Sequence, residues 1–188
     1  SIAAATIEEI RRSLPELPAQ RVRRFREQYK LGEYDAVTLV REKPLAEYFE
    51  ECVRAGAGAK AVSNWILSEL LGRLNERGMS IGASPVSAQN LAGLIRLIEG
   101  EHISGKIAKE VLPVMLDTGR PAGDIVREKG LVQVTDRAQI EAAVDRVLSE
   151  NPRSVDDFRA GKKQALGHLV GQVMKATQGK ANPKLANE

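Results

Sequence analysis

Apolar residues recur every three or four positions through most of the chain, which is the spacing of amphipathic α-helices. From Pro44 to Asp117 this pattern appears four times, separated by short glycine-containing turns. The inward positions that it predicts are Leu45, Tyr48, Phe49, Cys52 and Val53, then Val62, Trp65, Ile66, Leu70 and Leu74, then Leu91, Leu94, Ile95 and Ile98, and finally Ile107, Val111 and Met115. We therefore expect a bundle of four helices here.

Polar residues at the ends of these stretches mark where helices start and stop. Ser87 and Ser104 precede two of them and are typical N-caps, while Thr118 and Gly119 close the last. Before the bundle, Thr6 with Glu9 forms the pattern of a capping box for a first short helix. A second helix follows the two prolines of SLPELP and is predicted to pack through Val22, Phe25 and Tyr29.

After Gly119 the pattern changes. Residues 121–128 predict one short helix, and LVQV at 131–134 is an extended piece too brief to build a sheet, which we interpret as a hinge. Asp136 is predicted to cap a helix that ends at Pro152, and Ser154 with Asp157 gives a second capping signal before a helix over Gly161–Lys180. The sequence thus predicts an all-α protein, with a helical bundle domain followed by a small three-helix domain.

Positive charge is concentrated near the end of the sequence. The chain has 188 residues and a formal net charge of +3, yet residues 158–187 contain no Asp or Glu. The positive residues in that stretch are Arg159, Lys162, Lys163, Lys175, Lys180 and Lys184. A phosphate backbone is a common partner for such a segment, but a solvated helix face with a lysine-rich tail explains the charge alone equally well.

A second group of basic residues lies in the helix before the bundle. Arg21, Arg23, Arg24 and Arg26 crowd this helix, and neighbouring glutamates nearly balance them. Contact with nucleic acid and a solvated linker face both remain open for these arginines.

Few features of the sequence indicate catalysis. Gly100, Gly105 and Lys106 match the spacing of a phosphate-binding loop, but a predicted helix precedes them and Ile107 stands where a hydroxyl is needed. The two histidines, His102 and His168, lack a carboxylate cluster beside them in sequence, and the single cysteine, Cys52, lies on an apolar stripe. Hydrophobic residues make up 43% of the chain, but none of their runs is long enough for a membrane helix, and the sequence shows no signal peptide. We therefore expect a soluble, cytoplasmic protein with no membrane partner.

Several blocks of the sequence resemble a known family. GKKQALGHLVGQVMKATQGKANP, from Gly161 to Pro183, is similar to the signature of the YqeY-type tail domain. SLPELPAQRVRRF, VSNWILSEL, ISGKIAKEVLPVMLDTG and IVREKGLVQVTD resemble, in order, blocks of the C-terminal half of the GatB family. GatB is the B subunit of the glutamine-dependent aspartyl/glutamyl-tRNA amidotransferase.

The resemblance implies a division of labour within a longer subunit. In the family, an N-terminal catalytic cradle uses ATP and magnesium to activate the misacylated side chain on tRNA, and ammonia arrives from GatA, with GatC bracing the pair. Nothing in this chain resembles the cradle, so we expect no cofactor and no catalytic residue here, and we expect the chain to be part of something longer. The resemblance implies linker helices at 1–32, a helical bundle at 33–119 and a YqeY-like tail domain at 120–188.

The family's tail domain contacts the elbow of tRNA, so tRNA(Asn) or tRNA(Gln) is the expected nucleic acid, rather than DNA. The candidate contact residues are Lys162, Lys163, His168, Lys175 and Lys180 in the tail, with Lys106 and Lys109 in the bundle. Because the tail helix has almost no aromatic residue, recognition by phosphate contacts and shape is favoured over base stacking. A scaffold that docks other subunits and a stand-alone YqeY-like protein are the alternatives.

Overall fold

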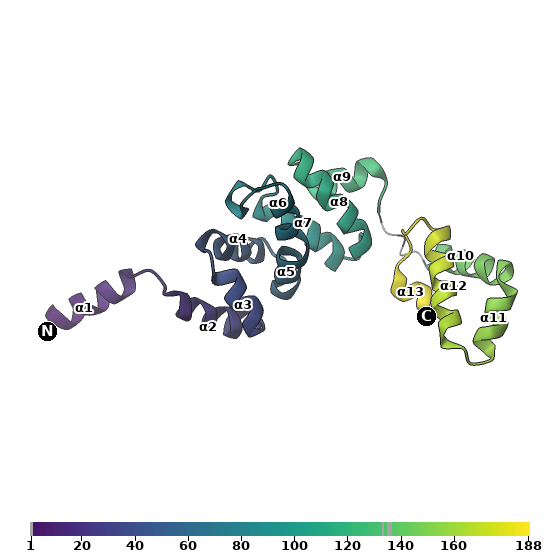
Figure 1. Ribbon diagram of the computed structural model, residues 1–188, viewed down its shortest axis with the longest axis horizontal. Coiled ribbons are helices and arrows are strands. Elements are labelled where there is room, and N and C mark those ends of the chain that lie inside the picture. Colours follow the sequence, from purple (N-terminus) through teal and green to yellow (C-terminus); the bar gives the residue numbers. More distant parts are fainter. Residues whose placement is uncertain (1, 133, 135–136) are drawn as a thin grey trace.

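The computed structural model describes residues 2–132, 134 and 137–188 of the chain, with the side chains of Ile2 and Ala3 left aside. It confirms an all-α fold, because no strand occurs among these residues (Figure 1). The helices are α1 (Ile2–Ser13), α2 (Pro18–Tyr29), α3 (Glu33–Val40), α4 (Lys43–Arg54), α5 (Ala59–Trp65), the π-helical turn η1 (Ile66–Leu70), α6 (Leu71–Glu76), the 3₁₀ turn η2 (Ile81–Ala83), α7 (Ala88–Glu99), α8 (Gly105–Thr118), α9 (Ala122–Lys129), α10 (Arg137–Glu150), α11 (Pro152–Arg159), α12 (Lys163–Ala176) and α13 (Pro183–Asn187).

The main core of the molecule lies among α2 to α9. The apolar positions predicted from helical spacing are buried in it, including Phe49, Leu70, Leu91 and Met115. Trp65, expected as a core anchor, is partly buried and packs against this core. The core is continuous from Phe25 to Val126. It includes buried residues of α3, a helix that the sequence pattern did not predict.

An aromatic cluster and an ionic cluster attach α2 to this bundle. The rings of Phe25, Tyr29 and Phe49 meet with centroids 5.0–5.3 Å apart, two of the three pairs edge to face. Beside them, the Arg24 guanidinium donates to Glu16 at 2.7 and 2.8 Å and also to Glu50. The hydrogen bonds from Arg24 and Arg21 outweigh desolvation and lower the pKa of Glu16 to about 2.

Most of the predicted helix ends in the bundle are confirmed. Ser87 accepts a hydrogen bond from the Asn90 amide, and Ser104 accepts one from the Ile107 amide, so both are N-caps. Gly119 ends α8 with a left-handed conformation at φ 68°. The capping box predicted at Thr6 is wrong, because α1 begins at Ile2 and Thr6 lies inside it.

The start of the predicted tail domain packs with the bundle. Ala122, Ile125 and Val126 of α9 are buried in the main core, where α9 contacts both α7 and α8. The bundle's core therefore extends past residue 119, the predicted end of that domain. The predicted cap at Asp136 lies outside the described residues.

A second, smaller core holds the tail helices together. Val147 of α10 and Leu169 and Val173 of α12 are its buried members, with Val155 and Ala186 packed against them. The capping signal predicted at Ser154 is wrong, because Pro152 opens a separate helix, α11, that contains it. The helix predicted over Gly161–Lys180 is α12, which is shorter at both ends.

The segment after α12 joins the two parts of the chain. Val134 forms an isolated parallel bridge with Ala181, in which the Val134 amide donates to Lys180 and the Asn182 amide donates to Val134. The buried Asn182 side chain caps α13 and donates to Glu101 of the bundle at 3.4 Å. The Lys180–Asn182 turn is thus a structural junction.

Candidate nucleic-acid interface

Helix α12 has one apolar face and one exposed polar face. Leu169 and Val173 face the small core, while His168 and Lys175 share an exposed face of the helix and Lys163 is exposed at its first turn. Gly161, at φ 88°, allows the chain to reverse between α11 and α12. This reversal places the two helices against each other.

Three of the predicted contact residues meet at the corner between α11 and α12. Lys162, Lys163 and His168 line one hollow of about 490 Å³. The other residues that line it are Ser154, Asp157, Gln164 and Ala165. We call this hollow the α11–α12 corner. It is the place where the tail brings positive and hydrogen-bonding side chains closest together.

The corner contains one acidic residue, Asp157, which lies just outside the acid-free stretch of the sequence. Lys162 Nζ lies 2.8 Å from Asp157 Oδ1, and this hydrogen bond lowers the pKa of the Asp157 carboxyl. The acid-free stretch of the sequence starts one residue after Asp157, so the count excluded it. The spacing of five residues across the Gly161 reversal is the signal that could have indicated this pair.

Two other tail lysines lie apart from the corner. Lys175 is exposed on α12, seven residues beyond His168, so it projects from the same face about 10 Å further along the axis. Lys180 is partly buried, and its carbonyl accepts the Val134 amide in the junction. Gly179 has a left-handed conformation, at φ 75°, and Pro183 opens α13.

Lys106 and Lys109 belong to the bundle, on α8. Both are exposed, and Lys109 Nζ lies 2.9 Å from Glu69 Oε1, so part of its charge is balanced. Neither lysine lines the α11–α12 corner. The structure therefore divides the seven predicted contact residues into a corner group, Lys175 on the same helix, the junction lysine Lys180, and a pair on the bundle.

The structure accounts for the residues whose sequence pattern could have suggested catalysis. The Gly100–Lys106 loop follows helix α7, and its Ser104 caps α8. Cys52 is buried, and burial raises the pKa of its thiol to about 12. Within the described residues, no group of three or more His, Cys, Asp or Glu side chains is placed to hold a metal ion. Over the same residues, no helix is both long and apolar enough to cross a membrane.

Comparison with known proteins identifies similar sequences along nearly the whole chain. Residues 47–188 match the family model described as the GatB domain. The B subunits of aspartyl/glutamyl-tRNA(Asn/Gln) amidotransferase are 47% identical to the chain over 181 residues in Thermotoga petrophila and 49% identical over 183 residues in Persephonella marina. The one from Rhodospirillum rubrum is 48% identical over 184 residues.

These matches cover 96–98% of the chain but only 38–39% of each relative. The chain therefore spans less than two fifths of the length of these relatives.

Proposed function

The chain belongs to the GatB family, and from this membership we propose that it is a tRNA-binding, non-catalytic portion of an amidotransferase B subunit. The observation that carries the proposal is the α11–α12 corner, where Lys162, Lys163 and His168 surround one hollow. Ammonium groups in such a hollow attract the phosphates of folded RNA, and the imidazole ring of His168 can add a hydrogen bond.

The arrangement favours recognition of the RNA backbone. Lys175 lies two turns beyond His168 on the same face of α12, so these two side chains form a line of contacts that continues from the corner along the helix. Among the described residues, none that lines the corner is aromatic, and stacking of bases needs such a platform. We propose that this face holds the outer surface of tRNA(Asn) or tRNA(Gln) by charge and shape.

The chemistry would then reside elsewhere in a longer subunit. We propose that ATP, magnesium and the ammonia-transfer step belong to the part of such a subunit that this chain does not span, with GatA and GatC as the partner subunits. In this arrangement the tail fixes the tRNA while the misacylated end is modified at another site, in the cytoplasm where translation takes place.

The test is the triple variant Lys162→Ala, Lys163→Ala, Lys175→Ala, titrated with labelled tRNA(Asn) at 50 and 200 mM salt. Each lost phosphate contact should reduce the salt slope by about 0.7–0.9, so the fall in affinity between the two salts becomes about threefold smaller per contact. The matched control is Lys43→Ala, Lys60→Ala, Lys129→Ala, which removes equal charge from exposed positions outside the corner. Equal salt slopes for both triple variants would contradict the proposal.

A scaffold that docks other subunits is favoured by one separate observation. Ile7 and Ile10 of α1 are 54% exposed, and Leu14 just beyond it is 63% exposed, so an apolar stripe is available for protein contact. Size-exclusion runs of the chain with tRNA and with partner subunits separate these functions. Co-elution with the subunits alone would support the scaffold.

A further inference from the structure

The basic residues of α2 fall into two groups that the sequence could not separate. Arg21 and Arg24 both have carboxylate partners: Arg21 Nε lies 3.0 Å from Glu16, in the segment before α2, and Arg24 bridges Glu16 and Glu50 of α4. Their charges are balanced by these carboxylates. Arg24 therefore attaches the helix to α4 of the bundle through Glu50, while Arg21 holds the segment that precedes the helix.

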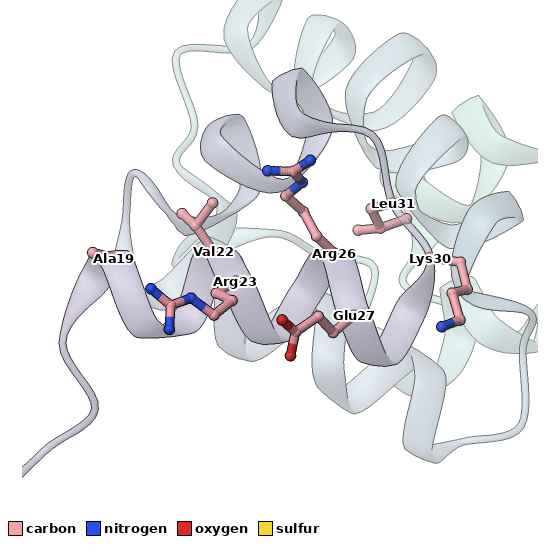
Figure 2. Close-up of a pocket in the computed structure, with 7 residues that line it drawn as sticks. All are labelled: Ala19, Val22, Arg23, Arg26, Glu27, Lys30 and Leu31. Atoms are coloured by element: carbon pink, nitrogen blue, oxygen red, sulfur yellow. The ribbon is translucent and has the colours of Figure 1, made fainter.

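The remaining basic residues lie on the outer side of the helix. Arg23, Arg26 and Lys30 are spaced by three and four residues, so they share one face, and all three are exposed. They line a groove of about 780 Å³, which we call the α2 groove. Figure 2 shows the three side chains spaced along α2, with Glu27 near them.

Charge in this groove is only weakly compensated. Arg26 lies 3.8 Å from Glu33, and their side chains are 51% and 75% exposed, so this pair contributes little. Within the described part of the chain, neither Arg23 nor Lys30 forms an ion pair. Three cations and one acid, Glu27, line the groove, so it attracts anions.

The floor of the groove favours a polyanion over an amphipathic peptide. Leu31 is only 5% exposed and Val22 is half-buried, because both already pack in the bundle. A peptide helix would therefore gain little apolar contact here. The two arginines present planar forks of donors, which match phosphate oxygens, while the described residues of the lining offer no aromatic platform for bases.

We propose that the α2 groove is a second surface for RNA phosphates, formed by Arg23, Arg26 and Lys30. This proposal rests on the proposed tRNA binding and extends it to a site on another part of the chain. Helices α2 and α12 lie toward opposite ends of the molecule (Figure 1), so a long, folded RNA could contact both while a short one could not.

The experiment is the triple variant Arg23→Ala, Arg26→Ala, Lys30→Ala in the full chain, titrated with labelled tRNA(Asn) at 50 and 200 mM salt. The expected result is a salt slope smaller by about 1.4–2.7 for two to three lost contacts. The matched control is Lys43→Ala, Lys60→Ala, Lys129→Ala, none of which lines the groove. A second variant, Arg23→Lys with Arg26→Lys, keeps the charge and should retain most of the slope.

The outcomes separate this proposal from the tail function. If the groove variant behaves like the control while the α12 variant binds tRNA more weakly, the groove proposal is overturned and the tail function stands. If neither variant differs from the control, or if the parent chain does not bind tRNA, both proposals fail. A reduced slope in the groove variant, with the double Lys variant close to the parent, supports the groove.

Discussion

Arg24 is the residue whose replacement tests most sharply how the bundle holds α2. Its guanidinium contacts two carboxylates, Glu16 and Glu50, and Glu50 also accepts the Tyr29 hydroxyl at 2.8 Å. The replacement Arg24→Met keeps a long side chain beside the Phe25 ring but removes every charged hydrogen bond. Because the side chains of Glu16 and Glu50 are only 26% and 17% exposed, the variant leaves two poorly hydrated charges.

The expected loss follows from these contacts. Hydrogen bonds to charged groups contribute about 1.5–3 kcal/mol each when buried, but the Arg24 side chain is 34% exposed and solvent screens part of this. Arg21 still holds Glu16 and Tyr29 still holds Glu50. We therefore expect Arg24→Met to lower the free energy of unfolding of the bundle by about 2 kcal/mol at pH 7.

The pH dependence gives the reasoning a second readout. Hydrogen bonds from Arg24 lower the pKa of Glu16 to about 2, and for Glu50 the large opposing effect of burial is outweighed by the hydrogen bonds from Arg24 and Tyr29 together with the nearby positive charges, so its pKa is also lowered. Carboxylates with a lowered folded-state pKa contribute stability that is complete above their unfolded pKa and is lost as the pH falls through the folded pKa. The difference between parent and variant should therefore shrink below about pH 4.5.

Urea unfolding followed by Trp65 fluorescence measures this difference, since Trp65 is the only tryptophan and packs on the main core. The matched control is the double variant Arg24→Met with Glu50→Gln, which removes the stranded charge and should recover part of the loss. A variant within about 0.5 kcal/mol of the parent at pH 7 would refute the expected magnitude. A difference that stays constant down to pH 3 would refute the ionic mechanism.

Two further predictions concern the tail and the core. Gly167→Ala and Gly171→Ala should each stabilise the tail by about 0.5–1 kcal/mol in thermal melts, because an added Cβ meets nothing within 4 Å and alanine favours the helix. Unchanged or lower melting temperatures would mean that α12 is not a regular helix there. The Cys52 thiol should react with a chromogenic thiol reagent far more slowly in the folded protein than in urea, because it is buried and its pKa is raised to about 12. Equal rates would contradict its burial.

Helical spacing was sufficient to predict the bundle, because most of its buried residues repeat at three and four positions. It did not predict the π-helical turn Ile66–Leu70, since one extra residue in a turn shifts the apolar face without breaking the pattern. The pattern also missed α3, whose eight residues are too few to show a period. The capping signals at Thr6 and Ser154 were wrong, because each residue lies inside a helix that begins before it.

Amino-acid composition was enough to identify the candidate contact residues, but it did not indicate which of them lie together in space. Composition identified the lysines of α12, but only the reversal at Gly161 brings Ser154 and Asp157 of α11 next to Lys162 in one hollow. Likewise, the four arginines of α2 look equivalent in sequence. Their separation into a paired group and an outward-facing group depends on Glu16, in the segment before the helix, and on Glu50, which comes from another helix.

Ion pairs and burial reduce the positive charge that some tail lysines can present to RNA. Lys162 must leave Asp157 before it can bind a phosphate, and Lys180 is partly buried in the junction. Lys163 and Lys175 are exposed and form no ion pair with any described residue. Since the charge of Lys162 is already partly balanced by Asp157, the Ala variant of Lys162 alone should change the salt slope less than the replacement of an unpaired lysine. Taken singly, the replacements of Lys163 and Lys175 should therefore account for most of the change in salt slope that the triple variant shows.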